Sequence, residues 1–171
     1  MRKIVALILL TGFACSNGVE KTEDKFFSLD NYFNQEQQRL SDSNIRPDKT
    51  VKRNQDSEHM QDAAINWATE LALFRESDIN KPAWKNSYSV NQSPVQISYS
   101  ARDSSLRTRE ILIEKNQEGK VIAIKIKNRT ENSLFSSEEY LIYRPDSLYL
   151  IDKKQKVLLL GSNHYSIVGK F

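Results

Sequence analysis

The sequence predicts an α+β domain in which two N-terminal helices pack on an antiparallel meander sheet of six or seven strands. Apolar residues recur with the helical period of about 3.6 between residues 26 and 79, and with the strand period of two from Tyr88 onward. Only a few residues separate the strand-like runs, which is too few for helical crossovers. The strands should therefore pair antiparallel, and two amphipathic helices can cover the apolar face of their sheet.

The first predicted helix covers residues 26–44. Leu29, Phe33 and Leu40 fall at i, i+4 and i+11, so they share one face of a helix. Ser28 stands directly before this run and is placed to act as its N-cap. The polar stretch that follows, residues 45–61, is compatible either with a short hairpin or with a loop.

The second predicted helix covers residues 62–79, with Asp62 as a possible cap. Its apolar stripe comprises Ala64, Ile65, Trp67, Ala68, Leu71, Leu73 and Phe74. Pro82 should end it, because the residue before a proline is pushed out of helical geometry.

The remaining residues predict the strands of the sheet. The strand-like runs are Val95–Ala101, Ile111–Ile113, Ile122–Ile126, Glu139–Tyr143, Leu148–Ile151, Val157–Leu160 and Tyr165–Val168. Asn116–Gly119 has the composition of a hairpin turn. Isoleucines at 122, 124 and 126 alternate with Ala123, Lys125 and Lys127, which predicts a strand with one buried face.

Residues 1–14 have the pattern of an export signal. Arg2 and Lys3 form a short positive region, and the uninterrupted apolar run Ile4–Leu10 follows. This run is too short to span a hydrocarbon core of about 30 Å, which needs roughly 20 residues. The signal leads to Ala14 and to Cys15, the single cysteine of the chain, so no intramolecular disulfide can form.

This segment resembles the signal peptides of bacterial lipoproteins, in which a small residue precedes an obligatory cysteine. Ala14 and Cys15 match that pattern, whereas Gly12 stands where the family more often has an aliphatic residue. The resemblance implies that Cys15 becomes the first residue of the mature protein and carries a thioether-linked diacylglycerol and an acylated amine. Such a multi-chain anchor holds a protein stably on a membrane. In the Gram-negative lipoproteins that this segment resembles, an aspartate after the cysteine often means retention in the inner membrane; because Ser16 stands there, the resemblance implies delivery to the outer membrane of the cell envelope.

We therefore expect a signal peptide over residues 1–14, a lipidated cysteine and flexible polar tether over 15–25, and one α+β domain over 26–171. The formal net charge is +3, but the predicted signal contributes Arg2 and Lys3, so 23 basic and 22 acidic residues remain. A body this close to neutral argues against nucleic acid as a partner.

Residue patterns of catalysis or metal binding are missing from the sequence. There is no GxSxG motif and no glycine-rich phosphate loop. His59 has acidic neighbours in the segment DSEHMQD, but their spacing fits neither zinc nor calcium, and His164 precedes a late strand. We therefore expect no enzyme activity, no cofactor and no metal site.

Trp84 and Trp67 are the candidate binding residues. Trp67 lies within an apolar helical stripe, which favours the core, and Trp84 follows Pro82 in a turn, where it could form the rim of a binding surface. The string Asp146-Ser147-Leu148 resembles a short O-glycosylation signal that some Gram-negative bacteria use on exported proteins.

Three hypotheses of function follow. The first is a binding or structural module of the envelope that contacts a protein or a lipid; the body is similar to Gram-negative lipoproteins that have no assigned activity. The second is a lipid or lipoprotein carrier, because the element pattern looks like the half-barrel of the carriers and receptors that move lipoproteins through the periplasm. A carrier would need an apolar cavity lined by Ile122, Ile124, Ile126, Tyr99 and Leu71. The third, a hydrolase, would need His59 or His164 beside acids in a cleft. We favour the first.

Overall fold

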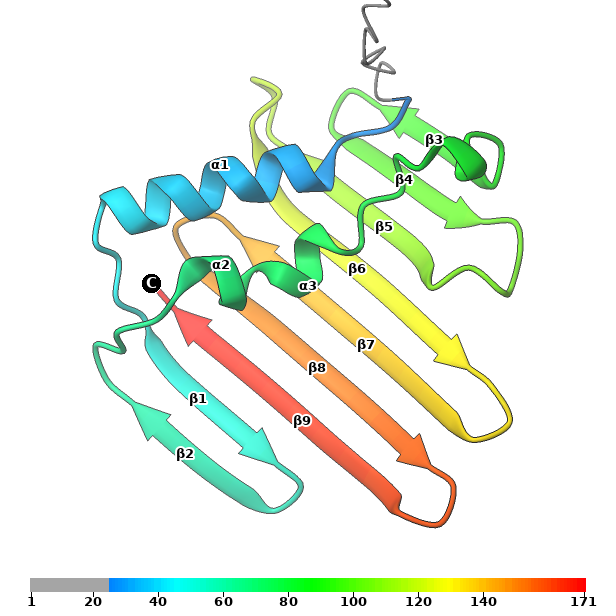
Figure 1. The fold of residues 1–171 in the computed structure, drawn as a ribbon. Coiled ribbons are helices and arrows are strands. Elements are labelled where there is room, and N and C mark those ends of the chain that lie inside the picture. Colours follow the sequence, from blue (N-terminus) through cyan, green and yellow to red (C-terminus); the bar gives the residue numbers. More distant parts are fainter. Residues whose placement is uncertain (1–24) are drawn as a thin grey trace, which may run out of the picture.

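The structure is a computed structural model that describes residues 25–171, so Cys15 and the predicted signal lie outside the described residues. The protein is α+β, with helices over one face of an antiparallel sheet (Figure 1). Helix α1 spans Leu29–Asp42, and the predicted cap is confirmed, because Ser28 Oγ accepts a hydrogen bond from the amide of Asn31 at 3.2 Å. Its apolar stripe, Leu29, Phe33 and Leu40, is buried against the sheet as expected.

The sheet has nine strands in the order β2-β1-β9-β8-β7-β6-β5-β4-β3, and every neighbouring pair is antiparallel. The strands are β1 (Asp48–Arg53), β2 (Asp56–Met60), β3 (Tyr88–Ser93), β4 (Gln96–Ala101), β5 (Thr108–Lys115), β6 (Val121–Glu131), β7 (Phe135–Arg144), β8 (Leu148–Val157) and β9 (Gly161–Lys170).

The prediction of six or seven strands preceded by two helices was too simple. The polar segment between the helices forms the β1–β2 hairpin, and β1 pairs with β9, so the last strand lies inside the sheet. β2 is the edge strand and β1 lies next to it, and none of their side chains is fully buried, so these strands show no apolar alternation in the sequence. β3 is the other edge strand, and only Tyr88 in it is buried.

The second helix is shorter than predicted and is broken in two. Helix α2 spans Trp67–Glu70 and α3 spans Ala72–Arg75, and the side chain of Asn66, rather than Asp62, caps α2. Asp62 instead has a positive φ of 48° in the turn after β2. A short 3₁₀ helix, η1 (Pro82–Trp84), leads into β3.

Two strand predictions also need correction. Val157–Leu160 is not a strand, because β8 ends at Val157 and the three leucines that follow form the turn to β9. Ile122 does not share a face with Ile124, because the β5–β6 register shifts between Glu114 and Lys115. This bulge turns Ile122 out to 48% exposure.

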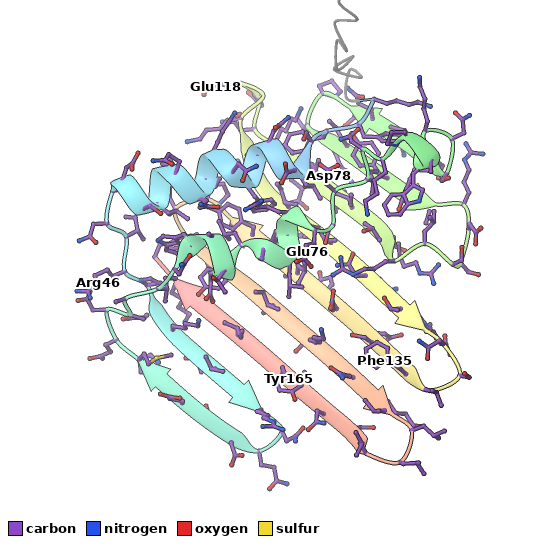
Figure 2. The ribbon with its side chains drawn as sticks, viewed as in Figure 1. Arg46, Glu76, Asp78, Glu118, Phe135 and Tyr165 are labelled. Atoms are coloured by element: carbon purple, nitrogen blue, oxygen red, sulfur yellow. The ribbon has the colours of Figure 1, made fainter. Side chains whose placement is uncertain are left out.

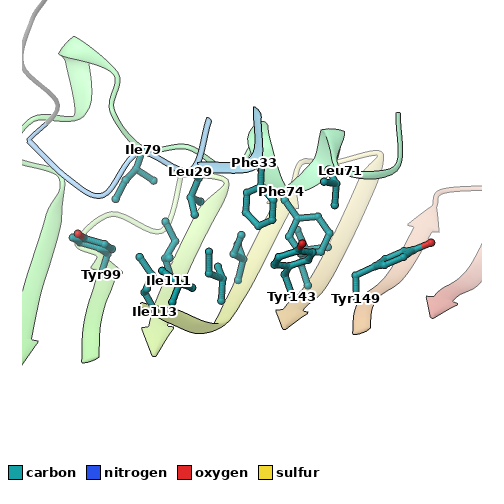
Figure 3. Close-up of a cluster of buried hydrophobic side chains, with 14 of the residues drawn as sticks. Leu29, Phe33, Leu71, Phe74, Ile79, Tyr99, Ile111, Ile113, Tyr143 and Tyr149 are labelled. Atoms are coloured by element: carbon teal, nitrogen blue, oxygen red, sulfur yellow. The ribbon is translucent and has the colours of Figure 1, made fainter. Parts of the chain in front are cut away.

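The core lies between the helices and the upper half of the sheet as Figure 1 is drawn. Leu29, Phe33, Leu71 and Phe74 point from the helices toward the sheet, and Ile111, Ile113, Tyr143 and Tyr149 meet them (Figure 3). Both tyrosine hydroxyls donate to helix carboxylates, Tyr143 to Glu36 of α1 and Tyr149 to Glu70 of α2. The buried aromatic rings thereby also fasten the helices to the sheet.

The lower half of the sheet has no helix over it. Strands β6 to β9 continue past the helices, and Phe135 and Tyr165 lie on this uncovered part (Figure 2). Both side chains are only half-buried. The chain therefore leaves the lower half of a long sheet, and the hairpins that end it, open to contact with other molecules.

Candidate functional site

A groove opens at the lower ends of β5 and β6, two neighbouring strands that have unequal lengths. β5 begins at Thr108, which pairs with Asn128, but β6 runs on to Glu131. Residues 129–131 thus extend beyond β5 and face the loop of residues 102–107 that connects β4 to β5. The groove between them has a volume of about 880 Å³, which is large enough for a small ligand or for one end of a larger one.

Basic side chains outnumber acidic ones in the lining of this groove. Arginine and lysine contribute five of the lining residues, Arg102, Arg107, Arg109, Lys127 and Arg129. The acidic residues that line it are Asp103, Glu110 and Glu131. We refer to this site, defined by its five cations, as the basic groove. Its excess of positive charge favours an anionic group.

Two of the five cations are committed to acids within the fold. Arg107 Nη2 donates to Glu139 at 2.7 Å, and its Nη1 donates to the backbone oxygen of Glu76 at 3.2 Å. Arg129 pairs with Glu131 at 2.9 Å and with Glu138 at 3.4 Å. Within residues 25–171, Arg102 and Lys127 have no ion pair and are exposed. These two side chains are therefore available to a ligand.

Arg109 is directed toward the groove by an irregularity in its strand. The β5–β6 register shifts between Thr108 and Glu110, so Arg109 is the extra residue of a bulge, a feature that re-aims a side chain. Its Nη1 donates to the backbone oxygen of Asp103 at 3.1 Å, while its Nε is buried and lacks a hydrogen-bond acceptor within the described residues. A buried donor without an acceptor costs stability. An acceptor supplied to Arg109 Nε would therefore be favourable.

A buried polar cluster supports the groove from behind. Glu139 is only 6% exposed and accepts hydrogen bonds from Arg107, from Asn128 Nδ2 at 3.1 Å and from Lys153 Nζ at 3.0 Å. Burial by itself raises the pKa of Glu139, but the hydrogen bond from Lys153 and the charge of Arg107 outweigh it, so that the pKa lies below its usual value. The carboxylate therefore stays ionised and holds the Arg107 guanidinium in place at the groove.

The candidate binding residues predicted from the sequence lie elsewhere. Trp67 is in the core, where it packs on Tyr149 and Phe171 and its Nε1 donates to the backbone oxygen of Ile45 at 3.3 Å. Trp84 is half-buried in η1, with Lys81 Nζ lying 4.2 Å from its ring centre. The structure does not bring these two residues together in one site.

The histidines are also separate from the groove. His59 Nδ1 lies 3.1 Å from the hydroxyl of Thr50, and His164 Nε2 lies 2.6 Å from a carboxylate oxygen of Asp152. In the part of the chain that the structure describes, no group of three or more His, Cys, Asp or Glu residues is placed to hold a metal ion. Ser147, in the string that resembles a glycosylation signal, is exposed in the β7–β8 turn.

Sequence reasoning missed the basic groove. Lys127 was interpreted as part of the polar face of a half-buried strand, which is correct but incomplete. The one signal that could have found the site is the density of basic residues at 102, 107 and 109, together with 127 and 129. The stagger of β5 against β6 that joins these segments cannot be read from that pattern.

Comparison of this chain with protein-family models, curated proteins and solved structures finds no match. Among residues 25–171, no helix has the length and the apolar character needed to cross a membrane. The functional argument therefore depends on the geometry of the chain itself.

Proposed function

We propose that this protein is a non-enzymatic binding module of the cell envelope, anchored to a membrane through lipidated Cys15, and that it holds an anionic group of its partner in the basic groove. The anchor follows from the N-terminal pattern of Arg2 and Lys3, an apolar run and the Ala14-Cys15 pair. Placement in the outer membrane is part of the same proposal.

The observation that supports the binding role is the positive charge in the groove that no ion pair neutralises. Arg102 and Lys127 are exposed without an ion pair in the described residues, and Arg109 Nε is buried without an acceptor. Charge-assisted hydrogen bonds from guanidinium to phosphate or carboxylate are about twice as strong as neutral ones, and the planar donors fit both groups. We infer a ligand that carries phosphate or carboxylate groups, such as an acidic glycan or lipid headgroup of the envelope.

The packing of the interior favours a binding module over a carrier. A cavity large enough for an acyl chain would leave accessible area on the side chains that line it. Leu71 and Ile124 are 0% exposed, Ile126 is 1% and Tyr99 is 4%, and all four belong to one cluster of buried residues. Ile122, the fifth residue of the expected lining, is on the outside. This close packing of the expected lining residues supports the binding module.

The binding role can be tested with inorganic pyrophosphate as the probe. Titration of the purified mature protein by calorimetry should give saturable binding that weakens as salt is added. The double variant Arg102→Gln/Lys127→Gln should bind about tenfold more weakly, which corresponds to about 1.4 kcal/mol. The control variant Lys52→Gln/Lys170→Gln loses the same charge from exposed positions on β1 and β9 and should bind like the parent. Equal weakening in both variants would show a response to net charge alone and would contradict the proposed site.

A further inference from the structure

We propose that the apolar tip formed by Leu134, Leu158, Leu159 and Leu160 inserts into the surface of an anionic lipid bilayer. This tip joins two adjacent hairpins, because the amide of Leu158 in the β8–β9 turn donates to the backbone oxygen of Leu134 in the β6–β7 turn at 2.9 Å. The leucines are 63%, 55%, 96% and 82% exposed in sequence order. Such a concentration of exposed leucine is uncommon on a protein that meets only water.

The backbone at the tip is a second observation in favour of a function. Leu159 has a φ of +73°, in the left-handed region that glycine, asparagine and aspartate occupy at low cost. A leucine there costs conformational energy and gains nothing from burial, since its side chain is almost entirely in water. Backbone strain of this kind clusters at functional sites such as ligand clamps and switch regions.

The charges around the tip favour a negatively charged surface. Within the described residues Lys154 and Lys156 form no ion pair, although Glu138 is the cross-strand neighbour of Lys154, and Glu131 and Glu138 both pair with Arg129. A shallow recess of about 400 Å³ lies beside the strands that lead into the two hairpins. Its charged lining comprises Lys154, Lys156, His164 and Arg129 together with the acids Glu131 and Glu138. Lysine stems can lie along the acyl region while their ammonium groups reach the phosphates. The tip thus combines four exposed leucines with two nearby lysines, Lys154 and Lys156, which we call the basic collar. Apolar residues beside basic ones are the pattern of interfacial membrane contacts.

The position of the tip indicates which membrane it would meet. The described chain begins at the upper edge of the sheet, where Lys25 Nζ donates to the backbone oxygen of Lys85, and the tip lies at the opposite edge (Figure 1). β8 and β9 have ten residues each, so the sheet is roughly 33 Å long in this direction. If residues 15–25 form the expected tether, their root-mean-square length is roughly 18 Å, which is well short of the length of the sheet. An anchored molecule would therefore present its tip mainly to a second bilayer or vesicle, and this direction depends on the proposed anchor at Cys15.

Capture of vesicles tests the proposal with the mature, lipidated protein. The protein is reconstituted into sucrose-loaded phosphatidylcholine donor vesicles and mixed with fluorescent, protein-free acceptor vesicles. The acceptors contain either phosphatidylcholine alone or phosphatidylcholine with one third phosphatidylglycerol. The measurement is the fluorescence that sediments with the donors. A blot of the same pellet reports whether the protein is anchored, so failure of the anchor is distinguished from failure of the tip.

We expect capture of the anionic acceptors, and a loss of about fivefold or more in Leu159→Ser/Leu160→Ser. Because both side chains are exposed, this variant should melt like the parent. The variant Lys154→Glu/Lys156→Glu should lose capture to a similar degree. Ile122→Ser is the control. It removes an exposed isoleucine near the start of β6, away from the tip, and should capture normally.

Three results would overturn the proposal. The first is equal capture by the parent and the leucine variant, which would show that the tip does not contact lipid. The second is equal capture of neutral and anionic acceptors, which would remove the role of the basic collar. The third is no capture at all by a protein that is fully retained in the donor pellet, which would assign the tip to a protein partner instead.

Discussion

At Gly169 in β9, the absence of a side chain lets an aromatic ring of the neighbouring strand lie against the backbone. Tyr149 is the cross-strand partner of Gly169, and a Cβ placed at Gly169 would lie 2.1 Å from Tyr149 Cε1. The ring cannot move aside easily, because it is 0% exposed, packs on Trp67 and Phe171, and donates its hydroxyl to Glu70 at 2.7 Å. Glycine in a strand often marks such a close approach.

Gly169→Ala should accordingly lower the free energy of unfolding by about 2 kcal/mol, the usual cost of overpacking a filled core. Urea denaturation followed by tryptophan fluorescence would measure it. The same substitution in a Tyr149→Leu background should cost less than half as much, because the clash is with the ring. A cost that is the same in both backgrounds would contradict this explanation.

At the scale of the elements, buried and partly buried carboxylates connect parts of the chain that local periodicity leaves independent. Glu36 and Glu70 join α1 and α2 to tyrosines of the sheet, and Glu70 also accepts from Lys49 Nζ of β1 at 2.8 Å. Glu139 joins β7 to β6, β8 and the loop before β5. Replacing one of these acids should loosen a junction between elements without unwinding any single element.

The hydrogen bonds of Glu139 make the free energy of unfolding depend on pH, and the direction of that dependence follows from its pKa. Its pKa is lower in the folded protein than the ordinary glutamate value. The unfolded state therefore binds the proton more readily. The contribution to stability is complete above about pH 4.3, the ordinary value, and is lost as the pH falls through the lower pKa of the folded state.

Glu139→Gln should cost about 2 kcal/mol at neutral pH, because charged hydrogen bonds are lost at a buried site. The parent and the variant should converge in stability as the pH falls below about 4. Denaturation curves across this range would measure the difference. Glu138→Gln, at an exposed neighbour, is the control, and a Glu139→Gln deficit that stays constant down to acid pH would contradict the assignment.

At the scale of the whole molecule, the basic groove and the apolar tip lie at the same end of the sheet, and Arg129 and Glu131 line both the groove and the recess beside the tip. The helices cover the upper half of the sheet, beside the edge where the described chain begins. The groove and the tip are at the lower edge, on staggered strand ends and hairpin turns. Both proposed binding regions therefore lie at the end of the sheet opposite the point where the described chain begins.

Cys15→Ser tests the anchor, because a hydroxyl does not replace the thiolate nucleophile that receives the diacylglycerol. We expect the variant to lose incorporation of radiolabelled palmitate and to keep its signal peptide uncleaved. Mass spectrometry of the N-terminal peptide should find acyl mass on the parent only. A variant that is processed and membrane-bound like the parent would exclude lipidation at this residue.

Part of the fold could be predicted because it depends on local patterns. Helix α1 was predicted from the spacing of Leu29, Phe33 and Leu40 and from the cap at Ser28, all within a few turns of chain. The burial of Trp67 followed in the same way. The choice between a hairpin and a loop for residues 45–61 stayed open, and the break at Leu71 was not predicted, because polar outer strands and short helices show little periodicity of their own.

The sequence by itself determined the α+β class, the first helix, most strand positions and the N-terminal pattern on which the proposed anchor rests. Only the tertiary structure decided the nine-strand order, the filled interior, the basic groove and the joining of Leu134 to the leucines of the next hairpin. The physical reason is the range of the interactions. Periodicity reports which face of an element is buried, whereas strand stagger, bulges and adjacent turns depend on pairing between residues that are distant in the chain.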